Sequence, residues 1–130
     1  MTQEEIQQIV DYAYPKIINY YGKGSKPIPP AELHFDIYAR LSGIEGMEGE
    51  ESDTSEAQYD PDTNMMYIYT RNMKNEEDVL RALIHEYTHY LQGITPLKTR
   101  VANQEYKYED NPYEQEAHAN EEKWKMFSQK

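Results

Sequence analysis

The sequence predicts a single α+β domain. Helix signals occupy residues 2–21, 75–92 and 111–127, whereas strand and hairpin signals lie between the first two of these stretches. At 130 residues, the chain is long enough for one modest core but too short for two. We therefore treat residues 1–130 as one domain.

The first helix begins with a capping box formed by Thr2 and Glu5. Gly22 is expected to end it after about Tyr21, and Pro15 predicts a kink or a restart within it. The apolar residues of this stretch recur at helical spacing: Ile6, Ile9, Val10, Ala13, Ile17 and Ile18.

Strand signals follow the first helix. Residues 33–41 alternate apolar and polar side chains, which predicts a half-buried strand. Residues 57–59 and 65–70, joined by a turn at residues 60–64, predict a β-hairpin. The segment 43–60 contains seven acidic residues, three glycines and no basic residue, which predicts a mobile loop or one that orders around a partner.

The second half of the chain is expected to be helical at both ends. Asn75 can cap a helix that Gly93 ends, with acidic residues in its first turn. Residues 94–110 are expected to be irregular, and Asn111 then caps a last helix that runs to about Phe127. The apolar stripe of the helix after Asn75 is Val79, Leu80, Leu83, Ile84, Tyr87 and Leu91.

Charge and composition exclude several classes of function. The formal net charge of −11 disfavours binding to nucleic acid or to anionic lipid. The chain has no cysteine, so disulfides and thiolate metal sites are excluded, and His and carboxylate side chains remain as metal ligands. Neither a long apolar run nor a signal peptide is visible, which predicts a cytoplasmic protein that does not contact membranes.

The segment 85–89, His-Glu-Tyr-Thr-His, is an H-E-x-x-H motif and is the strongest functional signal in the chain. Positions four apart on a helix differ by about 40° of rotation and about 6 Å of rise. His85 and His89 can therefore bind one Zn²⁺ from a single helix face. Glu86 is then placed beside the metal, where a carboxylate can deprotonate water. The alternative is a coincidence of two surface histidines on one helix.

Catalytic zinc takes three protein ligands and one water, so the motif needs a third ligand. A candidate lies at the start of the last helix, where residues 114–117 read Glu-Gln-Glu-Ala. This E-x-x-A segment after an H-E-x-x-H helix resembles the small gluzincin branch of the zincin metallopeptidases. The resemblance implies a zincin-like fold with an N-terminal helix, a small mixed sheet, the H-E-x-x-H helix and a C-terminal helix that carries the third ligand. By the same analogy, residues 65–70 would be the edge strand that faces the substrate.

Two glutamates compete for the role of third ligand. Glu114 and Glu116 both precede an alanine in an E-x-x-A context, but they lie about 200° apart on the helix, so only one can face the metal. We favour Glu114, whose alternative role is a capping-box carboxylate, and we expect Glu116 to be solvated. The family has an Asp after the alanine, and this chain has His118 there, or Asn120 if Glu116 were the ligand.

The resemblance implies a zinc metallopeptidase that holds one Zn²⁺ per chain through His85, His89 and Glu114. Glu86 would act as the general base for a zinc-activated water that attacks a peptide or protein substrate. A further donor is expected to stabilise the oxyanion, and the sequence does not choose among four candidates. These candidates are Tyr106, Tyr108, Tyr113 and His118.

Two other classes of function remain open at this point. A zincin-like binding or regulatory module would hold zinc without turning over peptides, and a metal-free domain would carry the motif by accident. The intact Glu86 favours the enzyme, because a purely structural zinc site does not need a base. At this chain length, either the cleft is shallow and open or a partner protein completes it.

Overall fold

The computed structural model describes residues 1–43, 48–49 and 54–129, and over these residues the protein has an α+β fold. The acidic stretch that the sequence singles out lies partly outside the described residues. The described elements comprise five α-helices, a three-stranded sheet and three short 3₁₀ helices. In chain order they are α1 (Gln3–Tyr21), β1 (Ala31–His34), α2 (Ile37–Ser42), β2 (Ala57–Asp60), β3 (Met65–Tyr69), η1 (Thr70–Asn72), α3 (Glu76–Leu91), α4 (Pro96–Glu105), η2 (Tyr108–Asp110), α5 (Pro112–Glu121) and η3 (Trp124–Phe127).

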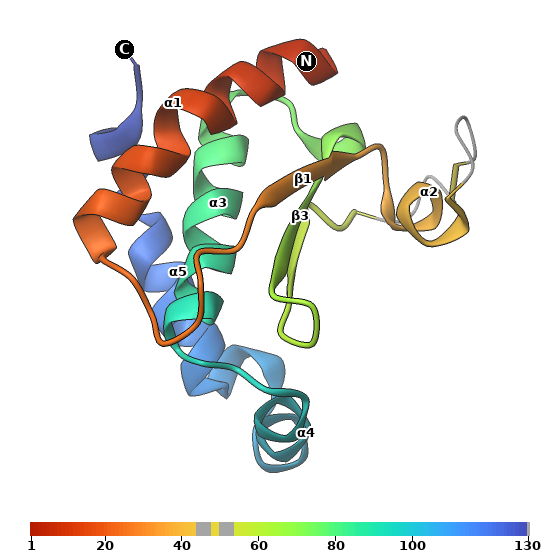
Figure 1. The fold of residues 1–130 in the computed structure, drawn as a ribbon. Coiled ribbons are helices and arrows are strands. Elements are labelled where there is room, and N and C mark those ends of the chain that lie inside the picture. The colour runs from red at the N-terminus through yellow and green to blue at the C-terminus, as the bar shows by residue number, and fades with distance from the viewer. Residues whose placement is uncertain (44–47, 50–53, 130) are drawn as a thin grey trace.

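Helix α3 lies at the centre of the fold, with the sheet on one side and α1 and α5 packed along it (Figure 1). Its predicted start is confirmed, because the Asn75 side chain accepts a hydrogen bond from the Asp78 amide at 2.9 Å. The core fills the space between α1, α3 and the sheet. Its largest fully buried side chains include Ile6, Ile17, Met66, Ile68, Leu80, Leu83 and Ile84.

The predicted N-terminal helix is confirmed as α1. Thr2 and Glu5 form both bonds of the capping box, at 2.9 and 3.1 Å. Gly22 follows the helix with a φ of 81°, a conformation that glycine adopts without steric cost. Pro15 lies inside this one helix, so the helix does not restart there.

The sheet has the order β1-β3-β2, with β1 parallel and β2 antiparallel to β3. The predicted hairpin is confirmed as β2 and β3. Assigning residues 65–70 to an edge strand was wrong, because β1 pairs with the other side of β3 and makes it the central strand. The edge strand next to α3 is β2 instead.

The strand predicted at residues 33–41 ends early, at His34, and the rest of that prediction was wrong. Asp36 caps α2 by accepting a hydrogen bond from the Ala39 amide at 2.8 Å. The Asp36 side chain also accepts from Arg71 at 3.0 Å and is buried. A buried helix cap therefore overrides the alternating pattern, and Leu41 from that pattern is largely exposed.

Two predictions in the second half of the chain need correction. Residues 94–110 are not irregular throughout, because Thr95 caps α4 by accepting from the Lys98 amide at 3.1 Å. The helix was missed because its apolar residues form no buried stripe: Leu97 and Val101 are exposed. The last helix was predicted to about Phe127, but α5 ends at Glu121 and η3 follows.

None of the helices in the described part of the chain is long and apolar enough to cross a membrane.

Candidate metal centre

The two motif histidines lie one turn apart in the second half of α3 and extend from the same face of the helix. Their rings are 4.8 Å apart between centroids, in an edge-to-face arrangement. The side chains of His85 and His89 are 13% and 9% exposed, so both are largely withdrawn from water. The predicted placement of the pair on one helix face follows from the helical period.

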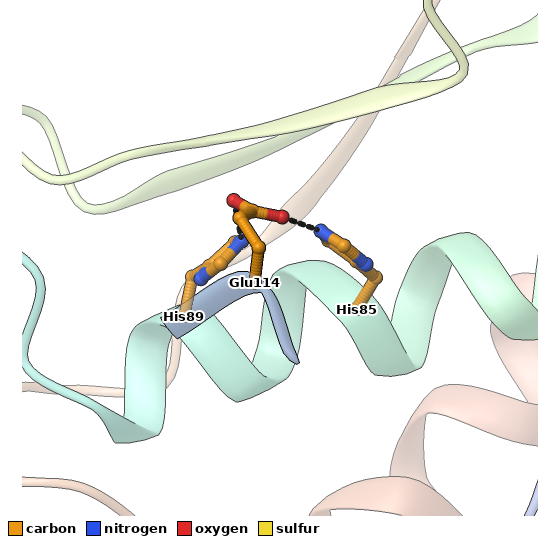
Figure 2. Close-up of side chains that lie close together, drawn as sticks. All are labelled: His85, His89 and Glu114. Atoms are coloured by element: carbon orange, nitrogen blue, oxygen red, sulfur yellow. Dashed lines mark hydrogen bonds and ion pairs between the residues drawn. The ribbon is translucent and has the colours of Figure 1, made fainter. Parts of the chain in front are cut away.

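Glu114, in the first turn of α5, lies opposite the two histidines. Its Oε2 is 2.9 Å from Nε2 of His85, and its Oε1 is 3.0 Å from Nε2 of His89. Figure 2 shows the carboxylate between the two imidazoles. Each oxygen of the Glu114 carboxylate is thus paired with the Nε2 atom of one histidine.

This donor set fits Zn²⁺. Ligand atoms in a tetrahedral zinc site with bonds of 2.0–2.1 Å lie about 3.3 Å apart. The separations of 2.9 and 3.0 Å run to different oxygens of the carboxylate, and ligand atoms taken one from each of the three residues lie within 4.8 Å of one another, so an ion fits after small side-chain movements. Two imidazoles and one carboxylate also match the ligand preference of catalytic zinc and leave a fourth position for water.

Close packing of α5 against α3 positions Glu114. Ala117 is completely buried at this contact, and its small side chain allows the helices to approach. The Gln92 side chain donates to the Tyr113 carbonyl at 3.0 Å, and Asn120 donates to the Thr88 hydroxyl at 3.1 Å. These bonds link the two helices on both sides of Ala117.

The structure brings Glu114, and not Glu116, to the histidines. The Glu116 carboxylate accepts a hydrogen bond from the Gln92 side chain at 2.7 Å and is exposed to solvent. The two glutamates therefore separate as their helical spacing predicted.

Each histidine has a second partner on its other ring nitrogen. Nδ1 of His85 is 2.6 Å from Oε2 of Glu121, and Nδ1 of His89 is 2.9 Å from Oε1 of Gln92. Such bonds fix the ring orientation and leave Nε2 of each histidine available to a metal ion. Glu121 and Gln92 make these bonds, whereas the family resemblance pointed to the residue after the alanine, His118 or Asn120.

Hydrogen bonds and charge govern protonation of the cluster in the metal-free protein. Burial opposes the charged form of His85, but hydrogen bonds to Glu114 and Glu121 and the charge of Glu86 outweigh it and raise the pKa to about 10. The pKa of His89 is raised for related reasons. Burial acts to raise the pKa of Glu114, but its bonds to both histidines outweigh burial and hold that pKa well below its ordinary value.

Glu86 is buried beside the histidines. Its Oε1 accepts a hydrogen bond from the backbone amide of Tyr59 in β2 at 2.9 Å, so the edge strand holds the carboxylate in place. Burial raises the pKa of Glu86, although the charges of His85 and His89 oppose the shift. The contact with Tyr59 was not predicted, because it depends on how β2 lies against α3.

His85, Glu86, His89 and Glu114 line a cavity of about 880 Å³. Helices α3 and α5 and the edge strand β2 contribute to its lining, and α4 contributes polar side chains. The other residues that line the cavity include Ala57, Gln58, Tyr59, Asp62, Thr99, Arg100, Asn103, Gln104, Tyr108 and Tyr113.

The four predicted candidates for oxyanion stabilisation differ in their positions relative to the cavity. The Tyr108 hydroxyl donates to Oε2 of Glu114 at 3.1 Å and lines the cavity. Tyr113 also lines the cavity, whereas Tyr106 lines a different one, of about 360 Å³. His118 has its Nδ1 2.9 Å from Oε2 of Glu121 and its Nε2 3.3 Å from the Tyr108 hydroxyl.

Comparison of the chain with models of protein families, with curated proteins and with solved structures found no match in any of the three.

Proposed function

We propose that the protein is a zinc metallopeptidase of the zincin-like kind, with gluzincin ligands His85, His89 and Glu114. One observation carries this proposal: the Glu114 carboxylate lies between the Nε2 atoms of both motif histidines. The buried Glu86 beside them and the cavity in front of them supply the base and the room that hydrolysis requires.

His85, His89 and Glu114 would hold one Zn²⁺. When bound, the ion polarises a carbonyl oxygen and lowers the pKa of water. Glu86 accepts the proton of the attacking water on its carboxylate and transfers that proton to the leaving amide nitrogen. The raised pKa of Glu86 supports this role, because a base with a pKa nearer neutrality accepts a proton more readily.

Tyr108 is the best placed of the four candidates to donate a hydrogen bond to the oxyanion. Its hydroxyl lies beside the Glu114 carboxylate at the wall of the cavity. Burial and the negative charge of Glu114 raise the pKa of Tyr108 to about 12, so the phenol keeps its proton at neutral pH. A neutral phenol can donate to a negative oxygen at this position.

Strand β2 offers backbone groups to an extended peptide. The Tyr69 amide donates to the Glu56 carbonyl at 2.9 Å, so every second residue of β2 forms the hydrogen bonds to β3. The intervening residues, Ala57 and Tyr59, direct their backbone groups away from β3, and both line the cavity. The Tyr59 amide already donates to Glu86, so a substrate that adds as a further strand on β2, rather than on β3, would pair with the other backbone groups of this edge.

Zinc content tests the ligand set. After exchange into zinc-free buffer, we expect about one zinc per chain in the wild type and in Glu116→Ala, and none in Glu114→Ala. Elemental analysis of the purified proteins measures this, with circular dichroism to show that the variants fold. Zinc-free wild type, or loss only in Glu116→Ala, would contradict the ligand set.

Turnover tests the enzymatic role. Incubation with a library of unstructured peptides, followed by mass spectrometry of the products, is expected to show cleavage by the wild type. Glu86→Gln should keep its zinc and cleave at least about 100-fold more slowly, because the general base is lost. Full zinc with equal lack of cleavage in both proteins would favour the alternative function, a binding module that holds zinc without turnover.

A further inference from the structure

A second cluster of metal-ligating atoms lies behind the first and shares His85 with it. Oε2 of Glu121 is 2.6 Å from Nδ1 of His85 and 2.9 Å from Nδ1 of His118. The ligand atoms of these three residues all lie within 4.8 Å of one another. His85 therefore has one nitrogen in each cluster: Nε2 faces Glu114, and Nδ1 faces Glu121.

The chemistry of this second cluster matches that of the first, with two imidazole nitrogens and one carboxylate oxygen. The two short separations must widen to about 3.3 Å for a tetrahedral ion with bonds of 2.0–2.1 Å. His118 can make this change, because its side chain is 53% exposed near the end of α5. The same exposure gives water access to complete the coordination.

The surrounding charge favours a cation. Glu121 supplies the carboxylate that contacts both histidines of this cluster. Its other oxygen, Oε1, is 3.9 Å from Nη1 of Arg81, a distance that leaves this ion pair loosely held. Burial and the charges of Asp78 and Glu121 raise the pKa of the nearby Glu56, although the charges of Lys74 and His85 oppose this shift. The cluster thus places two imidazoles beside the Glu121 carboxylate, with a further carboxylate, that of Glu56, nearby.

We propose that His85, His118 and Glu121 form a second site for a divalent cation of the Zn²⁺ type, which fills only when the metal is in excess. Binding breaks the Nδ1–H bond of His85, the proton leaves to solvent, and a bond from Nδ1 to the metal replaces it. With both sites filled, His85 would offer Nε2 to the first ion and the deprotonated Nδ1 to the second. The second ion binds more weakly than the first because it displaces this proton and because one of its ligands is exposed.

The test is a titration of the metal-free full-length chain with Zn²⁺ in the presence of a chromophoric chelator. The wild type should show a tight step and a weak step, each of about one ion per chain. His118→Ala should lose the weak step and keep the tight one, whereas Glu114→Ala should lose the tight step and keep the weak one. Circular dichroism verifies folding of both variants.

His34→Ala is the matched control. His34 also pairs with a glutamate, since its Nε2 is 2.5 Å from Oε1 of Glu32, but this pair belongs to neither cluster. We expect both steps to be unchanged in this variant. A tight step alone in the wild type, or a weak step that survives in His118→Ala, would overturn the second site and leave the first intact. A weak step alone in the wild type, abolished in His118→Ala, would instead refute the proposed catalytic centre.

Discussion

Glu121 makes the shortest of the hydrogen bonds that hold the motif histidines, at 2.6 Å from Nδ1 of His85. An anionic acceptor at Nδ1 keeps the proton on that nitrogen and makes Nε2 a better ligand. We therefore expect Glu121→Gln to weaken zinc binding at the first centre by about 10- to 100-fold, because the amide accepts without a negative charge.

Chelator competition measures this affinity, and Glu122→Gln provides the control. Glu122 is the next residue and is 75% exposed at its side chain, where it pairs with Arg81 at 3.4 Å. Its neutralisation should leave zinc affinity unchanged. An unaltered affinity in Glu121→Gln would show that the hydrogen bond to His85 does not support metal binding.

Among the individual site residues, the sequence alone predicted the relative positions of those that lie on one helix. His85, Glu86 and His89 share α3, so the helical period sufficed to place them. The resemblance to gluzincins suggested Glu114. Glu121 follows Glu114 by seven residues, two turns along the same face, and this spacing is the signal that could have found it.

The contact between α3 and α5 is the element-scale feature on which the centre depends, and Ala117 lies completely buried within it. We expect Ala117→Leu to lower the free energy of unfolding by about 1–3 kcal/mol, because the larger side chain overpacks the helix contact. The same displacement should move Glu114 and weaken zinc binding. Urea unfolding and chelator competition measure the two effects.

Ala119→Leu is the matched control, because Ala119 lies on the exposed face of the same helix. Its effect on the free energy of unfolding should stay within about 0.5 kcal/mol. If Ala117→Leu bound zinc like the wild type, α5 would not depend on this close approach to place Glu114.

The sequence predicted elements where local signals and burial agree, as in α1 and α3, each with a cap and a buried stripe. It failed at α2, where the alternating pattern conflicts with the cap provided by Asp36. It failed again at α4, whose exposed Leu97 and Val101 give no buried stripe. Pairing of β1 with the far side of β3 also escaped prediction, because strand order depends on contacts distant in the sequence.

For the molecule as a whole, we expect the proposed centre to couple stability to pH and to metal. In the metal-free protein, the pKa of His85 is raised from 6.5 to about 10, chiefly because hydrogen bonds to Glu114 and Glu121 outweigh its burial. A pKa that is higher in the folded state stabilises the fold fully below about pH 6.5, and this stabilisation is lost as the pH rises through about 10. Zinc binding replaces the proton, so the zinc-loaded protein should not lose stability through His85 over this interval.

We therefore expect the free energy of unfolding of the metal-free protein to fall by on the order of 1–3 kcal/mol between pH 7 and pH 10. Over the same interval, the difference between zinc-loaded and metal-free protein should grow. Urea unfolding of both forms at the two pH values measures these changes. Metal-free His85→Gln is the control for other groups that titrate in this range, and its stability should depend less on pH. Equal pH dependence in metal-free wild type and His85→Gln would mean that the pKa of His85 is not raised by its contact with Glu114. Zinc would then not have to displace a proton from His85 in order to bind.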